Sequence, residues 1–103
     1  MPSDRPYSIV YAPDVSAKLE DALRWWAEHR DKAPGLLARE FERALALIAA
    51  APELGQRART SRFGRLHRML LPKSKYHVYY RIFESETRVD LVLFRQAQRR
   101  PLR

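Results

Sequence analysis

The stretch that most constrains this chain is Tyr76-His77-Val78-Tyr79-Tyr80-Arg81-Ile82-Phe83. β-Branched and aromatic residues fill it, and it contains neither glycine nor proline, which is typical of a strand rather than a helix. Successive side chains of a strand point to opposite faces, and both faces carry aromatic bulk here. We therefore expect a central strand that is partly covered on both sides, with strand partners at Arg65–Leu71 and Arg88–Arg95.

The length of 103 residues fits one domain with a single core. The chain has no cysteine, which excludes disulfides and Cys-based zinc sites and favours a reducing compartment. No apolar run approaches the roughly 18 residues of a spanning helix, and residues 1–6 lack the apolar core of a signal peptide. We expect a cytoplasmic protein with no membrane partner: a disordered lead at 1–6, one domain at 7–96 and a basic tail at 97–103.

Positive charge is concentrated in the second half of the chain. Residues 1–56 hold 7 Lys/Arg and 9 Asp/Glu, whereas residues 57–103 hold 13 Lys/Arg and 3 Asp/Glu. This asymmetry indicates an anionic partner for the second half, either nucleic acid or an acidic protein segment. The alternative is that the arginines only keep a small domain soluble. Arginine is used far more than lysine, which suits bidentate contacts with phosphate or carboxylate.

Two stretches repeat apolar residues at helical spacing, and Asp31-Lys32-Ala33-Pro34-Gly35 separates them. The first repeat consists of Val15, Leu19, Ala22, Leu23 and Trp26, and the second of Leu37, Phe41, Ala44, Leu45 and Ile48. We expect an antiparallel helical hairpin whose second helix spans Leu36–Ala50. Trp25, Trp26 and Phe41 are expected mainly in the core, and Glu40 on the exposed side.

The segment Pro52–Gly64 is expected to be a loop, since Pro52, Gly55 and Gly64 interrupt it. Its arginines can close over a polyanion, or the segment can simply be a solvated connection. Pro72–Lys75 and Glu84–Thr87 are the turns between the last three strands. With a first strand at Tyr7–Ala12, the element order β-α-α-β-β-β predicts an α+β domain whose helical hairpin covers one face of a four-stranded sheet.

This order, with these residues in it, resembles the RelE/ParE family of toxins from bacterial type II toxin–antitoxin systems. The resemblance rests on the hairpin closed by Pro52-Glu53-Leu54-Gly55, on Arg68 and Pro72, on the strand from Tyr76 to Ile82, and on an apolar strand Val89–Phe94 followed by Arg-Arg-Pro. It extends over the chain from Tyr7 onward. It implies a RelE/ParE-like fold with a small, mostly antiparallel sheet.

The family has two activities, and the resemblance implies one or the other. ParE-like members act on DNA gyrase, whereas RelE-like members cut mRNA in the ribosomal decoding site. The long amphipathic hairpin and the Pro-x-x-Gly closure are more similar to the ParE branch, and the chain has no Tyr or His after Tyr80. We expect a ParE-like toxin that is neutralised by an acidic, partly disordered antitoxin. The alternatives are a ribosome-dependent endoribonuclease and a toxin fold that only binds its antitoxin.

The resemblance also assigns candidate residues. In the ribonuclease alternative, Arg65, Arg68 and Arg81 would stabilise charge, and His67 or His77 would transfer protons. Arg68 and Arg81 can instead pair with carboxylates or carbonyls inside the sheet. The expected contacts to target or antitoxin are six arginines: Arg57, Arg59, Arg62, Arg95, Arg99 and Arg100. No metal site, cofactor or small-molecule substrate is expected, because the histidines lack further ligands.

Overall fold

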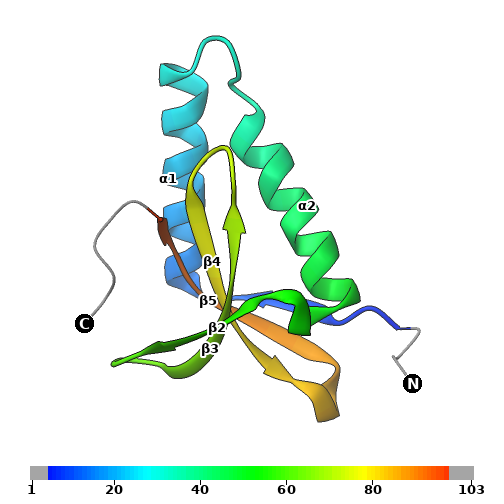
Figure 1. The fold of residues 1–103 in the computed structure, drawn as a ribbon. Coiled ribbons are helices and arrows are strands. Elements are labelled where there is room, and N and C mark those ends of the chain that lie inside the picture. The colour runs from blue at the N-terminus through cyan, green and yellow to red at the C-terminus, as the bar shows by residue number, and fades with distance from the viewer. Residues whose placement is uncertain (1–4, 98–103) are drawn as a thin grey trace.

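The computed structural model describes residues 5–97 as two helices packed on one mixed five-stranded sheet (Figure 1). The strands are β1 (Ser8–Tyr11), β2 (Gln56–Thr60), β3 (Gly64–Leu71), β4 (Tyr76–Phe83) and β5 (Arg88–Gln96). Their order across the sheet is β1-β5-β4-β3-β2. β1 pairs with β5 in parallel, and the other three pairings are antiparallel. The expected α+β class is confirmed, and the strand Tyr76–Phe83 is central as predicted.

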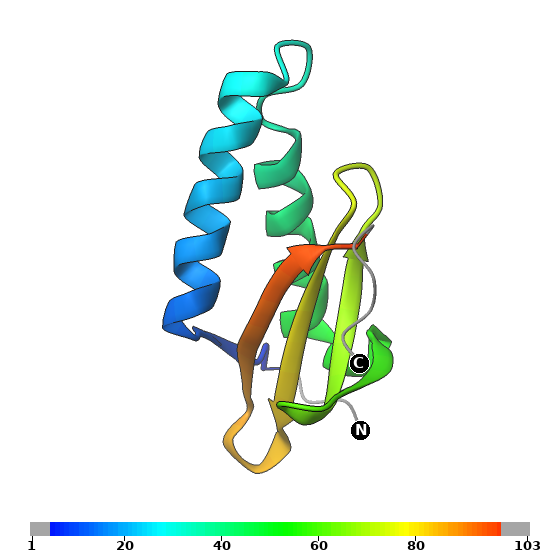
Figure 2. The ribbon, with the colours of Figure 1, turned by 90° about the vertical axis from the view of Figure 1, so that its left-hand side faces the viewer.

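The two helices form an antiparallel hairpin on one face of the sheet (Figure 2). They are α1 (Pro13–His29) and α2 (Leu36–Ala50), so the predicted bounds of the second helix are confirmed. Pro13 starts α1, where its missing N–H removes no helical hydrogen bond. Trp26 and Phe41 are buried, and the Phe41 ring meets the Phe94 ring edge to face at 5.8 Å. No helix within residues 5–97 is both long and apolar enough to cross a membrane.

The four-strand prediction was wrong, because Gln56–Thr60 forms strand β2 rather than a loop. This segment has little strand propensity of its own, and it is strand because it pairs with β3 across a short turn. The Thr60 hydroxyl accepts a hydrogen bond from Phe63 N–H at 2.8 Å, and Gly64 adopts φ +70°. These two residues fix the turn that brings β2 onto β3.

Strand β4 divides its side chains between the two faces of the sheet, as the alternation predicts. Tyr76, Val78 and Tyr80 belong to the core under the helices, whereas His77 and Tyr79 lie on the opposite face. The register between β4 and β5 shifts at Tyr79/Tyr80. Because of this shift, Leu91 and Phe94 of β5 both pack in the core, although they are three residues apart.

The Pro52–Gly55 closure has a structural reason. The Tyr80 hydroxyl donates a hydrogen bond of 2.5 Å to the carbonyl oxygen of Pro52, and burial raises the pKa of Tyr80 to about 12. A Cβ atom on Gly55 would lie 2.0 Å from that hydroxyl oxygen, so only glycine fits at this position. The closure therefore fastens the end of α2 to the central strand.

Two expectations about the helices were wrong. Glu40 is buried at 5% exposure, although it was expected on the outer side of α2. Its carboxylate accepts hydrogen bonds from the N–H groups of Lys73 and Ser74 at 2.9 and 2.7 Å, and from the Ser74 hydroxyl at 2.7 Å. Conversely, Trp25 is 42% exposed rather than in the core. The burial of Glu40 is decided by the β3–β4 turn, which supplies the donors of its three hydrogen bonds.

Candidate functional site

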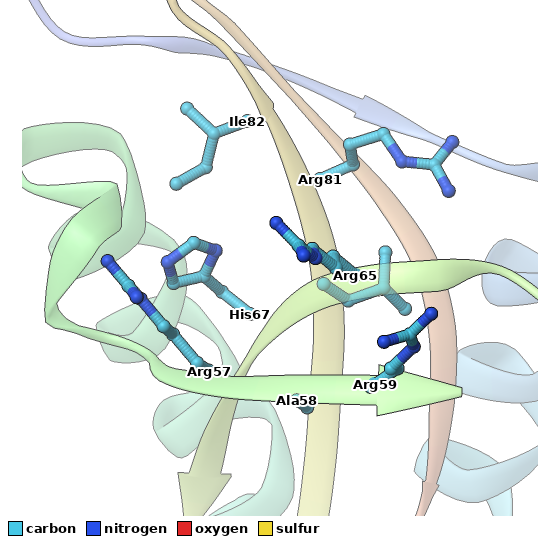
Figure 3. Close-up of a pocket in the computed structure, with 8 residues that line it drawn as sticks. Arg57, Ala58, Arg59, Arg65, His67, Arg81 and Ile82 are labelled. Atoms are coloured by element: carbon cyan, nitrogen blue, oxygen red, sulfur yellow. The ribbon is translucent and has the colours of Figure 1, made fainter.

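A groove with a volume of about 680 Å³ opens between the β2–β3 hairpin and β4 (Figure 3). Its lining combines five basic and three apolar residues: Arg57, Arg59, Arg65, His67, Arg81, Ala58, Leu66 and Ile82. Arg57, Arg59 and Arg65 are exposed, whereas Leu66 is buried. We call this the basic groove.

The register of β2 and β3 places like charges directly opposite one another. Arg59 and Arg65 carry like charges and pair directly, whereas Arg57 lies opposite His67. Like charges at such positions destabilise a sheet. Within residues 5–97 none of these three arginines forms an ion pair, and no acidic residue lines the groove. The protein thus holds a local excess of positive charge that an external anion would neutralise.

His67 sits against the core side of this groove. Its ring stacks on the ring of Tyr80, with centroids 5.7 Å apart and an angle of 23° between the planes. Since Tyr80 is fully buried and hydrogen-bonded to Pro52, it holds one face of the imidazole in place. Figure 3 shows His67 and Arg57 rising from adjacent strands on the same side of the sheet. This placement makes His67 part of the groove wall.

A second polar cluster lies on the other face of the sheet, away from the helices. Arg68 donates hydrogen bonds from Nε and one terminal nitrogen to the Gln56 side-chain oxygen, both at 3.3 Å, and from the other terminal nitrogen to the Tyr79 hydroxyl at 3.4 Å. His77 lies beside Tyr79, with ring centroids 5.8 Å apart. Burial lowers the pKa of His77, and the charges of Arg68 and Arg95 lower it further. At neutral pH this imidazole is therefore uncharged.

Arg81 has a structural role. Its terminal nitrogen donates a hydrogen bond of 2.6 Å to the carbonyl oxygen of Phe63, in the turn between β2 and β3. A contact between Arg81 and a carbonyl oxygen inside the sheet is the alternative to a catalytic role that was expected from the sequence. The bond ties the tip of the β2–β3 hairpin to the central strand, and thereby holds the basic groove in shape.

The structure does not bring the five candidate catalytic residues together. Arg65 and His67 occupy odd positions of β3 and line the basic groove, whereas Arg68 lies on the opposite face. His77 shares that opposite face, and Arg81 is bound to a backbone carbonyl. A single catalytic centre would need proton-transfer and charge-stabilising groups on one side.

The expected binding arginines are also distributed. Arg57 and Arg59 lie in the basic groove, whereas Arg62 lies in the adjacent turn, where its guanidinium is 5.0 Å from the centre of the Phe63 ring. Arg95 is opposite His77 on the helix-free face. Arg99 and Arg100 fall outside the described residues. Arg65, which was expected only as a catalytic residue, lies with Arg57 and Arg59 in the basic groove.

No group of three or more His, Asp or Glu side chains within residues 5–97 could hold a metal ion. The chain matches no protein-family model, and a search of curated proteins finds no match either.

Proposed function

We propose that this protein is a ParE-like toxin of a type II toxin–antitoxin pair that acts by binding a target protein, DNA gyrase. The proposal joins the family resemblance of the sequence with a surface suited to binding. An acidic, partly disordered antitoxin would neutralise it.

The observation that carries the proposal is the pairing of Arg59 with Arg65 in the basic groove. Like charges opposite one another destabilise a sheet. Their presence therefore indicates a role other than the stability of the sheet. Carboxylates of a partner, placed between the two guanidinium groups, would remove the repulsion and form charge-assisted hydrogen bonds. Ile82, which is half-buried in the same lining, would contact an aliphatic side chain of the same segment. An acidic chain that folds on contact fits this groove.

The division of the candidate catalytic residues between two faces also favours binding over catalysis. Arg65 and His67 are separated by the sheet from Arg68 and His77. Arg68 and Arg81 are already engaged in internal hydrogen bonds. On neither face of the sheet are these residues therefore preorganised to stabilise the charge that develops on the phosphate during RNA cleavage.

The RelE-like ribonuclease remains the second candidate, because one observation favours it. The His77 imidazole is uncharged at neutral pH and lies near Arg68 and Arg95. An uncharged imidazole beside cations can accept a proton from a ribose 2′-hydroxyl while the cations attract the phosphate. This cluster lacks a second group positioned to protonate the leaving oxygen, since the Tyr79 hydroxyl is bound to Arg68.

The two candidates differ in their assays. The full chain is expressed in bacteria with and without the adjacent gene, and the purified protein is added to a gyrase supercoiling reaction and to ribosomes programmed with mRNA. We expect growth arrest that the adjacent gene relieves, together with inhibition of supercoiling and intact mRNA. Codon-specific cleavage that disappears in His77→Ala, with supercoiling unaffected, would replace the proposal by the ribonuclease.

A binding prediction tests the groove itself. Arg65→Gln should slow association with the acidic antitoxin, because charge accelerates encounter. The same change should leave the free energy of unfolding unchanged or raise it by about 0.2–1 kcal/mol, since it removes a like-charge pair. Association is measured on immobilised protein over a salt series in which the Debye length falls from about 30 Å to about 8 Å.

The matched control is Lys18→Gln, which removes the same charge from the exposed side of α1. Equal association rates for the Arg65 and Lys18 variants would mean that total charge, rather than the groove, controls the encounter. A rate that is flat across the salt series would contradict the electrostatic argument altogether.

A further inference from the structure

A separate pocket of about 340 Å³ lies between the C-terminal end of α1 and the β3–β4 turn. Three cationic and three aromatic side chains form most of its wall: Arg30, Lys73, Lys75, Trp25, Trp26 and Tyr76. None of these residues takes part in the basic groove. We call it the Trp25 pocket.

None of the cations of the Trp25 pocket forms an ion pair with a carboxylate in the described part of the chain. Arg30, Lys73 and Lys75 are all exposed, and none forms an ion pair within residues 5–97. The nearby Glu40 carboxylate is buried beneath the turn and accepts hydrogen bonds from the backbone of Lys73 and from Ser74. No acidic side chain lines the pocket, and Lys73 is the pocket cation whose charge lowers the pKa of the buried Glu40 carboxyl group.

The aromatic residues hold one of these cations in a fixed place. The guanidinium carbon of Arg30 lies 5.2 Å from the ring centre of Trp25 and 5.2 Å from that of Trp26. Contact with two indoles restricts the guanidinium and leaves its N–H groups available for a ligand. Trp25 is 42% exposed, although a large apolar ring on an amphipathic helix is usually buried in the core. Its exposed part is therefore an apolar surface beside an anchored cation.

The backbone at Lys75 provides an independent indication. Lys75 adopts φ 65°, the left-handed region in which glycine or asparagine is favoured at such a turn. Glycine would satisfy the turn without steric cost, so the lysine side chain is present against a backbone preference. Strain of this kind is concentrated at functional sites, and here it places a cation at the rim of the Trp25 pocket.

We propose that the Trp25 pocket binds a nucleoside phosphate, either as a free nucleotide or as the end of a nucleic-acid strand. Three cations around so small a volume match a phosphate of charge near −2 better than a single carboxylate. Arg30 suits the planar array of phosphate oxygens, and the two lysines act as point charges. The Trp25 indole, one face of which is stacked on the His29 ring with centroids 4.6 Å apart, supplies apolar surface for the base. The pocket volume lies at the lower end of the range for small-ligand sites.

Isothermal titration calorimetry on the full chain tests this site with four probes: ATP, inorganic tripolyphosphate, a 5′-phosphorylated uridine tetramer and a glutamate decapeptide. We expect ATP or the tetramer to bind more tightly than tripolyphosphate, and the decapeptide to bind most weakly. The tighter of ATP and the tetramer identifies the source of the nucleotide. Lys75→Gly should weaken that binding about tenfold, as loss of one charge-assisted contact does.

The stability of Lys75→Gly and two further variants separate binding from folding. Lys75→Gly should leave the free energy of unfolding unchanged or higher, because glycine suits the backbone there. Lys75→Arg, which keeps the charge, should restore the affinity to within about twofold. Lys32→Gln removes a charge at the same end of the molecule but outside the pocket, and should leave binding unaffected.

Three results would overturn the proposal. If Lys32→Gln weakens binding as much as Lys75→Gly, the effect is general electrostatics. If ATP and the tetramer bind no better than tripolyphosphate, Trp25 contributes nothing and no nucleoside is recognised. If the glutamate decapeptide binds most tightly, the site belongs to an acidic protein segment.

Discussion

Removing the Glu40 side chain should detach the β3–β4 turn from α2. The carboxylate accepts three hydrogen bonds, two from backbone N–H groups and one from the Ser74 hydroxyl, at 2.7–2.9 Å. In Glu40→Ala each buried donor loses its partner, which costs about 1–3 kcal/mol per group. The Lys73 N–H is partly buried and can reach water, so the loss comes mainly from Ser74. We expect Glu40→Ala to lower the free energy of unfolding by about 2–4 kcal/mol.

The same contact has a pH signature. Burial alone would raise the pKa of Glu40, but the hydrogen bonds from Lys73 and Ser74 and the charge of Lys73 lower it below the ordinary value of 4.5. A carboxyl group with a lowered pKa stabilises the folded state above the unfolded-state value, and this contribution is lost as the pH falls through the folded-state value. The stability that depends on Glu40 is thus fully present at pH 7 and declines below about pH 4.5. Glu40→Gln should lack this part of the acid dependence.

Urea denaturation followed by circular dichroism at pH 7 and across the acid range measures both effects. Glu42→Ala is the control, because Glu42 is an exposed glutamate on the same helix. A difference between the two alanine variants below about 1 kcal/mol would refute the reasoning, since it is smaller than one unsatisfied buried donor costs. An acid transition identical in wild type and Glu40→Gln would refute the pKa argument.

Three further predictions concern the core and the Pro52–Gly55 closure. Phe41→Ala should cost about 3–5 kcal/mol in denaturant unfolding, because the ring is 5% exposed and contacts Phe94; a loss under about 1 kcal/mol would show that it does not support the core. Tyr80→Phe should lower the free energy of unfolding by about 1–3 kcal/mol, because the Pro52 carbonyl oxygen loses its hydrogen-bond donor. The wild-type protein loses stability as the pH rises from about 10 toward the Tyr80 pKa of about 12, and Tyr80→Phe should lack this loss. Gly55→Ala should be less damaging in the Tyr80→Phe background than alone, because the clash at 2.0 Å involves the hydroxyl oxygen; a double-mutant cycle without coupling would contradict this.

The sequence by itself determined the elements that carry their own periodicity. Alternation and aromatic content identified the strand Tyr76–Phe83, and the helical spacing of apolar residues identified α2 with its bounds. These patterns are local consequences of which side chains must be buried, so no knowledge of the partners was needed.

Only the tertiary structure decided features that depend on partners distant in the chain. The segment Gln56–Thr60 is a strand because β3 supplies its hydrogen bonds, and Glu40 is buried because the β3–β4 turn, more than 30 residues away, supplies its donors. The same holds for the candidate site. Arg59 and Arg65 are both visible as basic residues, but only the register of two strands places one opposite the other. Charge is a property of composition, whereas repulsion depends on distance, and distance is set by the fold.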